Sequence, residues 1–195
     1  VGQYFATPYL RVFPRKVTLA PNESQIVKVQ LTKAKKLNEG EYRSHLYFRA
    51  IKNNNPLEGK ERVVDSTSIS VKLEAIFGIS IATIIKKGTS NTITTISNLF
   101  YEKDKELNHF INFNLNRTGN MSTYGDIHIN YVSLDNTIVE VAKVKGVAVY
   151  TPGKVRKVKI QLKTPKGITF TGGKFKVAYT ANESKEILAD AELQF

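Results

Sequence analysis

The most regular stretch of the chain is Ile69–Ile81, in which apolar and polar positions alternate over thirteen residues. Every odd position is apolar, and the even positions are polar or small except at Ile76. A repeat of two residues is typical of a β-strand with one apolar face. Because strands usually hold about 5–6 residues, the pattern predicts either one long strand or two collinear strands that bend near Gly78, where glycine permits a bulge.

This strand has two interpretations. It can be an ordinary strand whose apolar face fills the core of its own β-sandwich. It can also be an edge that pairs with another protein, because an exposed edge offers unpaired backbone groups and alternate side chains for a groove. On the second interpretation Ile69–Leu73 forms the binding edge, and the predicted partner-binding residues are Ile69, Val71, Leu73, Ala75 and Phe77.

The remaining periodic segments are rich in β-branched and aromatic residues, and turn residues separate them at short intervals. That pattern is typical of an all-β protein, and we find no amphipathic helix. In the first half we expect extended segments at Tyr9–Leu19, Gln25–Leu31 and Glu41–Ile51. In the second half we expect strands at 92–101, 107–116, 125–132, 137–144, 146–150, 154–162, 173–180 and 186–195.

One sequence motif, or frame, occurs twice and indicates two related domains. Leu37-x-x-Gly40-x-Tyr42 fits the tyrosine corner of immunoglobulin-like sandwiches, in which the hydroxyl bonds back to an upstream backbone group. The frame returns with Phe175 in place of the tyrosine. We therefore predict two tandem immunoglobulin-like β-sandwich domains, residues 1–87 and 88–195, which meet near Lys86–Ser90.

The first of these domains is short, because only twenty residues precede its Pro21 turn. Four strands do not close a sandwich and leave an apolar face and edges uncovered. We therefore predict that the first domain lacks its opening strands and that the native polypeptide extends beyond Val1.

The composition and charge of the chain argue against some classes of function. The chain has 195 residues, 41% of them hydrophobic, with no Cys and a net charge of +12. The composition is that of a globular protein, and no apolar run is long enough for a membrane span. The basic residues are spread over alternating strand positions without an aromatic-basic motif, which indicates a solvated basic face and no specific nucleic-acid binding.

Catalytic and metal-binding motifs are absent from the sequence. The three histidines stand far apart on predicted strands, without the close spacing of metal ligands. We interpret Glu39 and Glu41, on either side of Gly40, as part of a solvated turn and not as a catalytic pair. We expect no enzyme activity, catalytic residue, cofactor or metal.

Several stretches together resemble the periplasmic pilus-assembly chaperones, the PapD-like family, and most of all chaperone-like members from Bacteroidetes-type bacteria. The stretches that carry the resemblance are Pro8–Gln25, Gly40–Arg49, Gly78–Ile81, Asn116–Asp126 and Gly146–Pro152. They are turn-and-strand frames that span nearly the whole chain.

The resemblance implies two immunoglobulin-like domains and a chaperone of the periplasm, with a signal peptide upstream. It implies binding of pilus or cell-surface subunits by a lent strand, here Ile69–Ile81. The family also anchors a subunit's terminal carboxylate with a basic pair in the cleft between the domains. This chain departs from that pattern, because it has no basic residue at Gly78–Ser80, and the next ones are Lys86 and Lys87.

Two further hypotheses stay open. The chain can be a structural scaffold or accessory subunit of a cell-envelope assembly built from tandem sandwiches. It can also be a sandwich-type enzyme or carbohydrate binder. A concave site with aromatic platforms would favour that hypothesis. The sequence does not determine the partner's identity or the oligomeric state.

Overall fold

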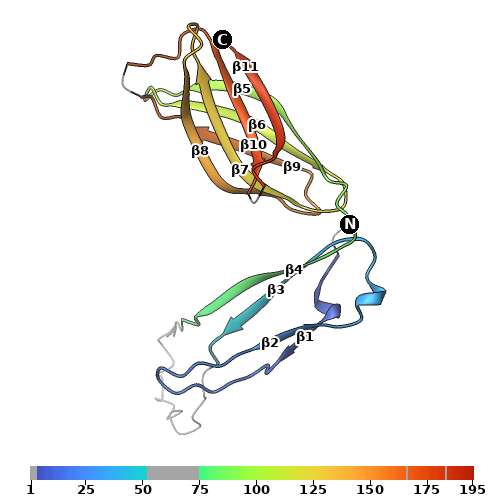
Figure 1. Ribbon diagram of the computed structural model, residues 1–195. Coiled ribbons are helices and arrows are strands. Elements are labelled where there is room, and N and C mark those ends of the chain that lie inside the picture. The colour runs from blue at the N-terminus through green and yellow to red at the C-terminus, as the bar shows by residue number, and fades with distance from the viewer. Residues whose placement is uncertain (1–3, 52–74, 166, 183) are drawn as a thin grey trace, which may run out of the picture.

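The computed structural model describes residues 4–51, 75–165, 167–182 and 184–195. The chain forms two bodies placed end to end (Figure 1). The N-terminal half contains β1 (Leu10–Phe13), β2 (Lys28–Leu31), β3 (Gly40–Arg49) and β4 (Gly78–Lys87), with two short 3-10 turns at Thr7–Tyr9 and Ala34–Lys36. The prediction of an all-β fold is confirmed.

The C-terminal half is a β-sandwich of two antiparallel sheets. A three-stranded sheet has the order β5-β6-β9, and a four-stranded sheet has the order β11-β10-β7-β8. This division of seven strands over two sheets is that of an immunoglobulin-like sandwich. The strands are β5 (Ile93–Lys103), β6 (His109–Thr118), β7 (Thr123–Val132), β8 (Ile138–Val149), β9 (Val155–Gln161), β10 (Lys174–Ala181) and β11 (Ile187–Gln194).

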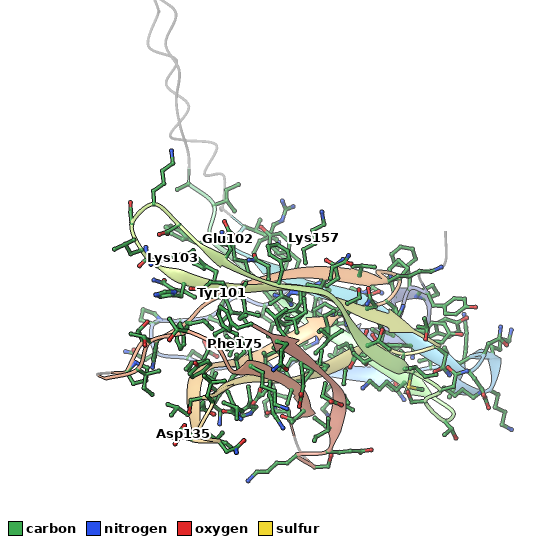
Figure 2. The ribbon with its side chains drawn as sticks, turned by 90° about the horizontal axis from the view of Figure 1, so that it is seen from above. Tyr101, Glu102, Lys103, Asp135, Lys157 and Phe175 are labelled. Atoms are coloured by element: carbon green, nitrogen blue, oxygen red, sulfur yellow. The ribbon has the colours of Figure 1, made fainter. Side chains whose placement is uncertain are left out.

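The core of the C-terminal sandwich lies between its two sheets. Inward-facing residues of both sheets are fully buried, and the largest of them are Tyr131, Tyr179 and Phe175. Figure 2 shows Phe175 between the layers. Alternation in these strands therefore works as the sequence predicts, with one face of each strand packed inward.

Two strands that the sequence separates at Lys145 are one strand in the structure. The expected strands 137–144 and 146–150 form β8, which runs on to Val149. Gly146 has a φ of 71° in the middle of β8, and its N–H donates to the Asp126 carboxylate at 2.9 Å. The register of β8 against β7 shifts at the same place. The glycine therefore marks a β-bulge and not a turn.

The tyrosine corner is confirmed. The Tyr42 hydroxyl accepts a hydrogen bond from the backbone N–H of Asn38 at 2.9 Å, and Tyr42 is buried. In the C-terminal half the corresponding Phe175 has no hydroxyl. Its cross-strand neighbour Tyr131 supplies one, which donates to the carbonyl of Gly172 at 2.8 Å.

The N-terminal half is built differently from the C-terminal sandwich. It consists of two separate two-stranded antiparallel ribbons, β1-β2 and β3-β4. Its cluster of buried apolar residues among those described is small and consists of Ala6, Leu37 and Tyr42. The first strand is also shorter than expected, since the segment expected at Tyr9–Leu19 is a strand over Leu10–Phe13 alone.

Removing the corner hydroxyl tests how much this small core depends on it. We expect Tyr42→Phe to lower the free energy of unfolding of the N-terminal half by about 0.5–1.5 kcal/mol, the usual net contribution of one hydrogen bond. Urea denaturation measures the change. Tyr47→Phe is the matched control, because Tyr47 is exposed, and equal losses in the two variants would contradict the prediction.

Candidate partner-binding surface

One face of the β3-β4 ribbon carries a row of apolar side chains. The register places Phe48 opposite Ile79 and Leu46 opposite Ile81. Residues directly opposite each other in an antiparallel pair share a face. The face continues toward Tyr42 and Ile85, where it joins the small N-terminal core. We call the open part, made of Leu46, Phe48, Ile79 and Ile81, the apolar face of β3-β4.

This apolar face is uncovered in the described chain. Ile79 is 67% exposed and Ile81 is 53% exposed. Leu46 is half-buried and Phe48 is exposed. Single exposed apolar residues are ordinary, but a contiguous row on one sheet face marks an interaction surface.

The second ribbon presents a matching row. Leu10 lies opposite Leu31, and Val12 lies opposite Val29, so these four side chains share one face of β1-β2. Val29 and Leu31 are exposed as well. Figure 1 shows β1-β2 next to β3-β4, and the two ribbons are separate sheets. Both ribbons of the N-terminal half thus carry apolar residues that the described chain does not bury.

Strand β4 also offers a backbone edge. It pairs with β3 along ten residues, and no other described strand pairs with it. The start of β3 is covered, because the carbonyl of Tyr4 accepts a hydrogen bond from the N–H of Arg43 at 2.9 Å. The long open edge of β4 therefore lies beside the most exposed part of the apolar face, a combination suited to strand addition.

The structure describes two of the five predicted partner-binding residues. Ala75 and Phe77 are exposed, Phe77 to 80%. They precede β4, and the carbonyl of Phe77 accepts a hydrogen bond at 3.0 Å from the N–H of Ala50, the residue after β3. Ile69, Val71 and Leu73 lie outside the described residues.

The predicted site omits the residues that form the exposed row. Ile79 and Ile81 belong to the same alternating stretch, and extending its period would have found them. Leu46 and Phe48 alternate in the strand expected at Glu41–Ile51, yet their pairing with β4 depends on a register that the sequence does not give.

A buried carboxylate joins the two halves of the chain. Glu41 is 2% exposed and accepts hydrogen bonds from the Ser122 hydroxyl and from the Ser122 N–H, the latter at 3.0 Å. Arg43 pairs with the same carboxylate at 3.2 Å, and its guanidinium lies 3.8 Å from the centre of the Tyr150 ring. Since Ser122 and Tyr150 belong to the C-terminal half, this cluster fixes one half against the other.

The interpretation of Glu41 as part of a solvated turn is therefore wrong, although its neighbour Glu39 is exposed. Burial raises the pKa of Glu41, but the two hydrogen bonds from Ser122 and the charge of Arg43 outweigh burial and lower the pKa below its ordinary 4.5. The carboxylate is ionised and bound, which is a structural role.

The described residues show no metal centre. Among them no group of three or more His, Cys, Asp or Glu is placed to hold a metal ion. His45, His109 and His128 lie on three different strands. Within the described ranges no helix is long and apolar enough to cross a membrane.

Comparison with known proteins assigns no family. No family model and no curated protein matches this chain. A crystal structure of DesR, a β-glucosidase from Streptomyces venezuelae in complex with D-glucose, is similar at a TM-score of 0.38 and 11% identity. The match covers 55% of this chain and 15% of that enzyme.

The Glu41 cluster predicts an acid-sensitive junction. Because the folded pKa of Glu41 is lowered, its stabilisation is complete above the unfolded value near 4.5 and is lost as the pH falls through the folded value. We expect Glu41→Gln to lower the free energy of unfolding at pH 7 by about 1.5–3 kcal/mol, as for hydrogen bonds to a charged group.

Urea denaturation between pH 7 and pH 3 measures this contribution. The loss on acidification should be smaller in Glu41→Gln than in the wild type. Glu39→Gln, which changes an exposed carboxylate two residues away, is the control and should follow the wild type. A Glu41→Gln curve parallel to the wild-type curve would contradict the prediction.

Proposed function

We propose that this chain is a periplasmic chaperone-like binding protein that engages pilus or surface-protein subunits by β-strand addition. The observation that supports this best is the combination of the open β4 edge with the uncovered apolar face of β3-β4. The resemblance of the turn-and-strand frames to pilus-assembly chaperones supports the class of partner and the compartment.

Strand addition suits both parts of this surface. A strand added to β4 forms backbone hydrogen bonds, each contributing about 0.5–1.5 kcal/mol net. Ile79 and Ile81 can then be covered by alternate side chains of the partner, and burying such a residue contributes about 1.5–3 kcal/mol. Backbone pairing gives affinity for any extended segment, and the alternate side chains give selectivity for an apolar one.

A partner strand explains more of the surface than a small ligand does. The apolar residues run in rows along two ribbons, and the unpaired backbone groups run along the same direction. A small molecule would cover one or two side chains and leave the edge of β4 unpaired. An extended segment with apolar residues at alternate positions satisfies both.

A structural scaffold of the cell envelope is the second candidate. The buried Glu41 cluster favours it, because a fixed orientation of two sandwich-like bodies is useful to a permanent assembly member. The two functions differ in the lifetime of the complex: a chaperone releases its subunit, whereas a scaffold retains its partner.

Photo-crosslinking tests the proposal at the surface itself. A photoreactive amino acid is placed at Ile81, at Phe77 and, as a control, at Ile93, which is 64% exposed in the C-terminal half. The protein is expressed in the periplasm of its native host, and the crosslinked peptides are sequenced. We expect crosslinks from Ile81 and Phe77 to a segment with alternating apolar residues, and none of this kind from Ile93.

Ile81→Glu complements the crosslinking, with Ile93→Glu as its matched control. On the proposal, Ile81→Glu keeps the melting temperature of the wild type and loses the crosslink from Phe77. Two outcomes would overturn the proposal: unfolding of Ile81→Glu but not of Ile93→Glu, which makes the face part of the chain's own core, or retention of the crosslink. Exchange of the crosslinked partner in a chase separates chaperone from scaffold.

A further inference from the structure

The outer face of the β5-β6-β9 sheet has an unusual composition for a strand surface. Asn112, Asn114 and Asn116 stand at every second position of β6, the central strand of this sheet. Asparagine is depleted in strands, where threonine, valine and aromatic residues are favoured. Three amides in one column on a central strand therefore do not follow from strand formation alone.

The register surrounds this column with cations and an aromatic ring. One cross-strand row consists of Phe100, Asn112 and Lys159, and the next row consists of Ser97, Asn114 and Lys157. The side chains of each row share the outer face of the sheet. Figure 2 shows Lys157 and Glu102 on the same side of the molecule, opposite Asp135.

A β-bulge places the ring of Phe100 on the outer face of the sheet. The pairing of β5 with β6 shifts between Ser97 and Phe100, and Asn98 adopts a φ of 51° there. A positive φ is uncommon for a residue other than glycine, and bulges often redirect a side chain beside a functional site. Here the bulge leaves Leu99 against the core and Phe100 on the outer face, 51% exposed.

The bulge and the two rows enclose a hollow of about 410 Å³. The residues that line it include Asn98, Phe100, Asn112, Asn114, Lys157 and Lys159. Asn112 lies at its floor, 9% exposed, and its amide donates to Glu102 at 3.1 Å. The hollow thus combines an exposed ring with a few convergent polar groups, the usual character of a ligand site.

Among the residues that the structure describes, ion pairing leaves one of the two lysines that line the hollow for a ligand. Lys159 donates to Glu102 at 3.0 Å, and this bond is the main cause that lowers the pKa of Glu102. Lys159 is therefore held by a protein carboxylate, whereas Lys157 is exposed on the next row. The hollow offers one ammonium group, amides that both donate and accept, and the face of one ring.

We propose that this hollow binds an acidic saccharide, with the apolar face of a sugar ring on Phe100, its hydroxyls on Asn112 and Asn114, and its carboxylate on Lys157. A sugar hydroxyl is both a donor and an acceptor, which matches an amide better than an ammonium group. A phosphate backbone matches the amides less well, because its anionic oxygens only accept hydrogen bonds and leave the amide carbonyl oxygens without a donor. The site is separate from the proposed strand-binding surface.

The experiment is titration of the full, isotope-labelled chain with tetragalacturonate, followed by the backbone and side-chain amide signals in two-dimensional NMR spectra. The methyl ester of the same tetrasaccharide tests the carboxylate, a glutamate tetrapeptide tests charge without sugar, and an eight-residue oligothymidylate tests nucleic acid. We expect shifts at Phe100, Asn112 and Asn114 with tetragalacturonate, and much smaller shifts with the other three probes.

Three variants locate the contact. Lys157→Gln should weaken the binding of tetragalacturonate about tenfold, as loss of one charged contact does. Lys143→Gln makes the same charge change on β8 of the opposite sheet, where Lys143 is exposed, and should leave the binding unchanged. Phe100→Ala should weaken both the acid and its methyl ester.

Three results would overturn the proposal. The first is an absence of shifts at millimolar tetragalacturonate. The second is equal binding of the glutamate peptide or of the oligothymidylate, which would make the face a general anion-binding or nucleic-acid surface. The third is an equal effect of Lys143→Gln and Lys157→Gln.

Discussion

A β-ribbon with one apolar face has to bury that face, and this constraint governs the N-terminal half. Ile79 and Ile81 on β4, with Leu46 and Phe48 opposite them, need a layer that the described chain does not provide. The neighbouring ribbon β1-β2 has exposed apolar residues of the same kind at Val29 and Leu31. The proposed strand addition is the form of burial that also satisfies the free edge of β4.

In the C-terminal sandwich the apolar face of each sheet is covered by the other sheet. Its corner frame positions Phe175 between two complete sheets, and its inward residues form one large buried cluster. The N-terminal half has the same corner at Tyr42, yet its buried cluster holds three residues among those described. The two halves therefore differ in the strands available to cover the face, and the Glu41 cluster fixes the open surface relative to the closed sandwich.

Local patterns predicted most of the elements, and long-range pairing accounts for the rest. Alternation predicted the strands, and the spacing from Leu37 to Tyr42 predicted the corner, because each depends on neighbours within a few residues. The burial of Glu41 depends on Ser122, 81 residues away, so the sequence indicated a solvated turn instead. The bulges at Asn98 and Gly146 were not predicted, because a bulge depends on the register with the partner strand, which is also a long-range property.

Amide hydrogen exchange of the unbound protein tests the central claim most directly, because protection follows local stability. If the apolar face of β3-β4 is open, the amides of β4 along its free edge exchange within seconds, whereas those of β6 and β7 in the C-terminal sandwich stay protected for hours. Addition of the crosslinked partner segment as a synthetic peptide should then protect β4. Protection of β4 equal to that of β6 in the protein alone, with no change on adding the peptide, would contradict the account.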